Sequence, residues 1–136
     1  MLSFELIDCP PKQYPISSSN IQPYPTSSNN IQLKQMIIYN VTVKVTHAIA
    51  GEWVRWMKEE HMQQLIDTGL FYESRLCKLL ELDEEDGLTY VAQYFCDSMD
   101  DYQDYIKKYA PIMRDRGFKK FGDQFIAFRT LMQVEG

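Results

Sequence analysis

The chain has 136 residues and a formal net charge of −5, and hydrophobic residues make up 45% of it. This length and composition predict one domain with a single core. The acidic excess disfavours polyanions, so we expect neither nucleic acid nor an anionic membrane surface as a partner. No stretch approaches the ~20 apolar residues of a membrane span.

The cysteines Cys9, Cys77 and Cys96 are an odd number without C-x-x-C spacing. This pattern is typical of reduced thiols in a cytoplasmic protein rather than of disulfides or a zinc site. We expect Cys77 and Cys96 to be buried in strands. The sequence has no secretory signal, and it contains no dinucleotide, P-loop, nucleophile-elbow or zinc-protease motif. We therefore predict a cytoplasmic protein without metal or cofactor.

Residues 1–35 are rich in Ser, Asn, Gln and Pro, and 14–22 recur in modified form as 24–32. Such a composition buries too little apolar area to offset the entropy of ordering, so we predict a disordered extension. The repeated Tyr-Pro dipeptides could dock to a partner. We favour the alternative that the repeat is translated upstream sequence, that Met36 is the biological start and that the domain spans 36–134.

The first predicted strand covers 36–45, where apolar side chains such as Tyr39 and Val43 alternate with polar ones. A helix follows, because apolar residues recur from Ile49 to Met57 with 3.6-residue spacing. We expect Thr46 to cap this helix and Gly69 to end it.

Two β-rich runs, 70–82 and 88–96, flank an acidic turn and predict an antiparallel hairpin. Ser98, with Asp101 three residues later, resembles a capping box that starts a second helix. Pro111 lacks the amide hydrogen of a helix interior, so a kink or restart is expected there. Alternation over 124–134 predicts the last strand.

The order βαββαβ predicts a ferredoxin-like α+β fold, with a four-stranded antiparallel sheet and two helices on one of its faces. The other face would be bare, and neither the first nor the last strand has a uniformly polar side. A large exposed apolar patch marks an interface. We therefore predict a homodimer that packs sheet against sheet into an α/β barrel.

RNA-recognition modules share this topology and stack bases on aromatic residues of the bare face. Tyr39, Tyr90 and Tyr94 are the residues that would serve this role. Against RNA binding, Asp86 stands where the RNA motif has Lys or Arg, Gln93 replaces an aromatic residue, and the net charge has the wrong sign.

A candidate site lies on the first predicted helix. On a helical wheel, Trp53, Met57, Glu60, His61 and Gln64 share one arc, so three hydrogen-bonding side chains gather on an otherwise apolar face. Burial of a polar group costs free energy unless the group is hydrogen-bonded to the protein, reached by water or bonded to a ligand. The arrangement predicts a small-molecule pocket between this helix and the sheet.

In the functional interpretation His61 exchanges a proton or a hydrogen bond with a ligand, and Trp53 and Trp56 form apolar walls. In the structural interpretation His61 is a core histidine bonded to a strand residue. Arg129 also has two possible roles. It either pairs with Glu60 as part of the structure or holds an anionic ligand.

Three segments, 36–43, 53–61 and 121–131, resemble a small bacterial family of domains of unknown function. More distantly, Glu59-Glu60-His61 is similar to the dimeric α/β-barrel superfamily, which includes antibiotic-biosynthesis monooxygenases and stress-responsive barrel proteins. This resemblance implies the fold and the dimer, and a helix-one histidine at the pocket of some members. Gln63 stands where a proline often follows that histidine, and no haem-ligand pattern is present.

These observations predict an uncharacterised dimeric barrel protein that binds a small, largely apolar molecule. One alternative is a cofactor-independent monooxygenase or isomerase that uses His61. Another is a non-catalytic structural or protein-interaction module. The predicted site consists of His61 as the catalytic candidate and, as ligand-binding residues, Trp53, Trp56, Met57, Glu60, Gln64 and Arg129.

Overall fold

A computed structural model describes residues 35–136 of the chain. The prediction of a disordered extension over 1–35 lies outside these residues, apart from Gln35. The elements in chain order are β1 Ile37–Val45, α1 Ala50–Trp56, the π-helical turn η2 Met57–His61, α2 Met62–Asp67, β2 Glu73–Lys78, β3 Leu88–Cys96, α3 Met99–Lys108, α4 Ala110–Phe121 and β4 Phe125–Gln133.

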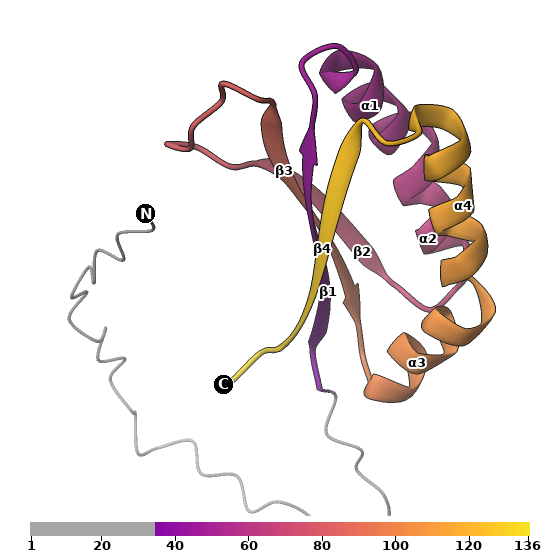
Figure 1. The fold of residues 1–136 in the computed structure, drawn as a ribbon. Helices are drawn as coiled ribbons and strands as arrows, with labels where there is room; N and C mark the ends of the chain where they lie inside the picture. The colour runs from indigo at the N-terminus through magenta and orange to yellow at the C-terminus, as the bar shows by residue number, and fades with distance from the viewer. Residues whose placement is uncertain (1–34) are drawn as a thin grey trace, which may run out of the picture. The chain divides into compact units, whose positions relative to one another are not determined.

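The four strands form one antiparallel sheet in the order β2-β3-β1-β4. The two central strands are therefore β1 and β3, and Tyr39 of β1 lies opposite Tyr94 of β3 and Leu131 of β4. The helices of residues 35–136 all lie on one face of this sheet, and within this part of the chain the other face carries no helix (Figure 1). The predicted ferredoxin-like α+β fold is confirmed.

Strict alternation along β1 decides which side chains enter the core. The side chains that point under the helices are only 0–4% exposed, and they belong to Ile37, Tyr39, Val43 and Val45. The residues between them point to the helix-free face, where Asn40 donates a hydrogen bond to Thr130 and accepts one from Gln93. The bare face thus has a polar centre across β3, β1 and β4.

Exposed apolar side chains surround this polar centre on β4. Ile126, Phe128 and Met132 are 61%, 66% and 38% exposed, and they lie on the same face as Asn40. Residues 35–136 leave their apolar surface uncovered.

The first predicted helix consists of three consecutive segments, α1, η2 and α2. It ends where the sequence predicts, because the N–H of Gly69 closes the last turn on the carbonyl of Ile66 and Gly69 has a positive φ of 79°. The predicted cap by Thr46 is wrong. Ile49 occupies the cap position without a side-chain bond, and the Thr46 hydroxyl instead bonds the amide oxygen of Gln124.

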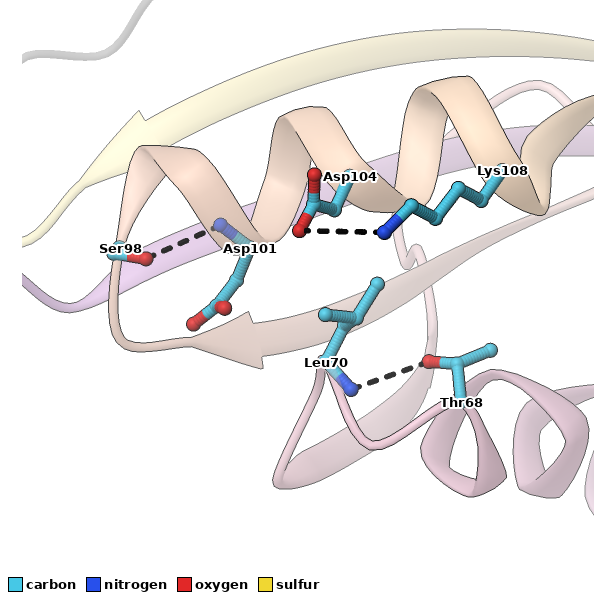
Figure 2. Close-up of polar contacts among 6 residues, drawn as sticks. All are labelled: Thr68, Leu70, Ser98, Asp101, Asp104 and Lys108. Carbon is cyan, nitrogen blue, oxygen red and sulfur yellow. Dashed lines mark hydrogen bonds and ion pairs between the residues drawn. The ribbon is translucent and has the colours of Figure 1, made fainter.

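The second predicted helix begins as expected at Ser98. Its hydroxyl accepts a hydrogen bond of 3.1 Å from the N–H of Asp101, and one turn later Lys108 pairs with Asp104 (Figure 2). The predicted restart is also confirmed, since α3 ends at Lys108 and α4 begins at Ala110, with Pro111 in its first turn, where no amide hydrogen is needed.

The edge strand β2 is shorter than the predicted run 70–82. Its start follows the end of α2 closely, and there the N–H of Leu70 donates to the hydroxyl of Thr68 (Figure 2). Cys96 is buried as predicted, but Cys77 is exposed, because it lies on the outer strand and on the face that has no helices.

The three tyrosines that an RNA-binding sheet would display are not on the bare face. Tyr39 and Tyr94 are 3% and 1% exposed beneath the helices, and Tyr90 packs against the indole of Trp53 at a centroid distance of 5.3 Å. No helix within residues 35–136 is long and apolar enough to cross a membrane.

Candidate functional site

The polar end of the first helix contains a π-helical turn. The backbone N–H of Met62 donates to the carbonyl of Met57, five residues earlier, instead of the four of an α-helix. Such a turn holds one more residue than an α-helical turn, so every later side chain shifts around the helix by one position. A helical wheel with constant spacing fails beyond Met57.

This shift corrects the predicted core face. His61 occupies the place that the wheel assigns to Glu60, and Leu65, which is 1% exposed, occupies the place assigned to Gln64. Glu60 is exposed to solvent, so its predicted position on the core face is wrong. Gln64 is half-buried at the edge of the core, where its Oε1 is buried without a hydrogen-bond partner among the described residues.

A cavity of about 140 Å³ lies between the helices and the sheet, beside His61. Its apolar walls come from the strands, from α1, η2 and α2, and from the start of β4. The apolar residues that line it include Val43, Trp53, Trp56, Met57, Leu65 and Phe125. Gly117 of α4 also lines it and leaves room there, since a Cβ on this residue would contact Trp56 and Phe125 at ordinary distances of 3.6 and 3.7 Å.

His61 meets the cavity as a neutral ring. Its imidazole stacks on Trp56 with 4.4 Å between ring centroids, and its Nδ1 is buried without a partner among the described residues. Burial, and to a lesser extent the charge of Arg116, lowers the pKa of His61 to about 4. The predicted bond to a strand residue is absent from residues 35–136, and one imidazole nitrogen is left unsatisfied.

Three tyrosines line the cavity from the sheet and α3. Tyr39 and Tyr94 are neighbours across β1 and β3, and Tyr105 of α3 packs on Tyr39 with 5.7 Å between centroids. Burial raises the pKa of both Tyr94 and Tyr105 far above the usual value for tyrosine, and the neighbouring phenols raise it further. These hydroxyls therefore keep their protons at neutral pH and are hydrogen-bond donors.

Two arginines line the cavity as well, Arg129 from β4 and Arg114 from α4. The Nε of Arg129 donates a 3.1 Å hydrogen bond to the hydroxyl of Tyr39. Within residues 35–136, neither arginine forms an ion pair, so the suggested pairing of Arg129 with Glu60 is not found. Both side chains are exposed, which places them where the cavity opens to solvent.

The structure brings together five of the seven predicted site residues. Those that line the cavity are Trp53, Trp56, Met57, His61 and Arg129. The sequence favours Tyr or Arg groups from the opposite strands but does not single out Tyr39 and Tyr94, and it gives no sign of Tyr105, Arg114 and Gly117 on the helices. The alternation of β1 does place Tyr39 on the core face. Arg114 lies 75 residues later in the chain than Tyr39, and no local pattern in the sequence shows that its helix covers the same part of the sheet. No cluster of three His, Cys, Asp or Glu side chains suited to a metal occurs among the described residues.

The strand order, the helices on one face and the cavity beneath them define a ferredoxin-like α+β domain. The sequence profile of a family described as "Domain of unknown function (DUF4286)" matches residues 36–135. The chain belongs to this family, which confirms the resemblance found in the sequence. No curated protein matches the chain closely enough to count as a relative.

Several solved structures share the fold. A dimeric ferredoxin-like protein from an uncultured marine organism superposes with a TM-score of 0.59 at 6% identity, covering 74% of this chain and 95% of the other. A conserved Bacteroides thetaiotaomicron protein of unknown function, described as a possible oxidoreductase, gives 0.54 at 12%, with 74% and 99% covered. A Streptomyces coelicolor monooxygenase in complex with nanaomycin D gives 0.51 at 14%, with 76% and 90% covered.

Proposed function

We propose that the protein binds a small, largely apolar molecule in the cavity between its first helix and the sheet. The observation that carries this proposal is the aromatic-lined cavity itself, next to a histidine nitrogen that is buried without a partner. Buried polar atoms are normally hydrogen-bonded, and an unsatisfied one costs about 1–3 kcal/mol. A ligand that bonds Nδ1 of His61 would recover this free energy.

The cavity volume limits the size of the ligand. An engineered apolar cavity of about 150 Å³ in another protein holds benzene. The present cavity, at about 140 Å³, is therefore suited to a single six-membered ring. Flat rings also fit the walls, because the indoles of Trp53 and Trp56 offer extended apolar faces.

An enzyme of the cofactor-independent monooxygenase or isomerase type is the second candidate, and the fold shared with the Streptomyces coelicolor monooxygenase is the reason to consider it. Proton abstraction near neutral pH needs a base whose pKa lies near 7. His61, with its pKa lowered to about 4, is a weak base. Ligand binding is the better supported function.

The ligand proposal can be tested with the two tryptophans of the chain, Trp53 and Trp56, because both line the cavity. Toluene should change their fluorescence in a saturable way and raise the melting temperature. Gly117→Leu and Ala127→Leu each fill part of the cavity and should abolish the response. Gly51→Leu is the matched control, since a Cβ there meets no atom within 4 Å. An unsaturable response, or one that persists in folded cavity-filled variants, would overturn the proposal.

We also propose that two copies of the chain pack through their helix-free faces. Ile126, Phe128 and Met132 form an exposed apolar surface there, and large exposed patches mark interfaces. A second copy is the proposed occupant, because the marine ferredoxin-like protein of the same fold is described as dimeric. A two-fold axis through the sheet would place the polar centre around Asn40 against its own copy.

A further inference from the structure

The distribution of charge around the cavity points to the chemical class of its ligand. The whole chain has five more acidic than basic residues, yet the cavity is lined by two arginines, and no Asp or Glu among residues 35–136 lines it. His61 adds no charge at neutral pH, because burial lowers its pKa. The local charge is therefore opposite in sign to that of the protein as a whole.

Two arginines contribute positive charge to the cavity. They approach from opposite layers of the fold, Arg129 from the sheet and Arg114 from α4. Both act on the same phenol, since the charges of Arg114 and Arg129 each partly offset the rise that burial causes in the pKa of Tyr105. Two positive charges therefore act on the same part of the cavity, where they would attract a small anionic group.

The guanidinium of Arg129 is held in place by its own hydrogen bond. Its Nε donates to Tyr39, a residue that is 3% exposed in the core, while its terminal nitrogens form no ion pair with residues 35–136. A guanidinium fixed in this way pays less entropy when it binds, and its fork of N–H groups matches the two oxygens of a carboxylate.

We propose that the ligand is a carboxylate carried on a single aromatic ring, with the ring in the apolar interior and the carboxylate on Arg114 and Arg129. This inference rests on the proposed ligand-binding function and adds the class of ligand. The lining of the cavity fits such a ligand. Its helix wall is apolar, with Trp53, Trp56 and Met57, and the exposed arginines lie at its opening. The protonated hydroxyl of Tyr105 can donate to the same carboxylate.

Three probes separate the effect of the ring from the effect of the charge. Benzoate has both features, benzamide has the ring without the charge, and acetate has the charge without the ring. Isothermal titration calorimetry of the full chain should give a dissociation constant for benzoate at least tenfold lower than for benzamide or acetate. Benzoate affinity should also fall as salt is raised, because the arginines are exposed.

Variants assign the effect to the two arginines. Arg114→Gln and Arg129→Gln should each weaken benzoate binding at least tenfold, and Arg129→Lys should restore only part of the affinity. Arg55→Gln is the matched control, because Arg55 is an exposed arginine of α1 that does not line the cavity. Since the two arginines are exposed, these variants are expected to fold, and circular dichroism checks this.

Each outcome decides between the two proposals. If toluene binds but benzoate binds no better than benzamide, or if the arginine variants leave benzoate affinity unchanged, the inference about the carboxylate is overturned and the apolar site stands. If neither toluene nor benzoate binds at millimolar concentration, the proposed function fails and this inference fails with it.

Discussion

The imidazole of His61 lies nearly parallel to the indole of Trp56, with 4.4 Å between their centroids and 22° between their planes. Residues five apart in an α-helix lie about 140° from each other around the axis and do not meet. In a π-helical turn, hydrogen bonds join residues five apart, so such residues lie almost one above the other. The π turn is therefore what places His61 against Trp56 and beside the cavity.

The buried, neutral state of His61 predicts a loss of stability in mild acid. Its pKa is about 4 in the folded chain and near 6.5 when unfolded. Between these pH values only the unfolded chain takes up the proton, so the free energy of unfolding falls as pH drops from 6.5 to 4, by on the order of 3 kcal/mol. His61→Phe keeps a ring on Trp56 and should remove this part of the pH dependence.

Denaturant titrations from pH 7 to pH 4 measure this difference. The control is His47→Gln, which changes the only other histidine, an exposed one on the loop before α1. This variant should keep the part of the pH dependence that His61 contributes. If the free energy of unfolding falls with pH equally in His61→Phe and in the natural chain, His61 is not the group that titrates.

The extra residue of the π turn predicts an unusual tolerance to deletion. Removal of the exposed Glu60 would convert the turn into a regular α-helical one and leave Trp53, Met57, His61 and Leu65 on the same core face. The deletion should therefore cost little, and the cavity should persist.

Deletion of Glu52, which is also exposed but lies in regular α1, is the comparison. It rotates the preceding part of the helix by about 100° relative to the rest and should unfold the domain. Melting followed by circular dichroism tests both deletions. If the two variants lose stability equally, the π turn is not a simple one-residue insertion.

The proposed dimer predicts a position-specific effect of charge. Phe128→Asp places a carboxylate at the centre of the helix-free apolar surface and should shift the protein to a monomer in analytical ultracentrifugation. Phe118→Asp on the outer side of α4 is the matched control, because Phe118 and Phe128 are 63% and 66% exposed in the single chain. A monomeric natural chain, or a monomer produced by both variants alike, would exclude this interface.

The turn before β3 predicts a strict requirement for glycine. A Cβ on Gly87 would collide with the carbonyl oxygen of Val45, a backbone atom that cannot move without disturbing the end of β1. Gly87→Ala should destabilise the domain by at least 2 kcal/mol, within the range of backbone and overpacking effects of about 1–3 kcal/mol.

The opposite result is expected for Gly51→Ala in α1. A Cβ there meets nothing within 4 Å, and alanine is favoured over glycine in helices by about 1 kcal/mol. Urea denaturation gives both values. A stable Gly87→Ala variant would mean that the chain can open the contact between Gly87 and Val45 at little cost.

Local patterns in the sequence were enough to determine the elements and their order. The alternation of β1, the cap at Ser98 and the proline at the start of α4 are each decided by residues close in the chain. Once these elements are placed, the ferredoxin-like arrangement follows from chain order, because antiparallel neighbours and helix crossovers allow few topologies. The solved structures that superpose on the chain share that fold.

The site depended on the tertiary structure for two physical reasons. A helical wheel assumes a constant turn per residue, whereas the helix has a wider turn after Trp56. This turn takes Glu60 off the core face, keeps His61 on it and brings Leu65 there. The cavity also needs side chains from β1, α4 and β4, and long-range packing alone brings Tyr39, Arg114 and Arg129 to one opening. The sequence by itself determined the fold, the helix that carries the site and five of the residues that line the cavity. Only the packed structure decided which side chains from the other elements join them, because long-range contacts bring those elements together.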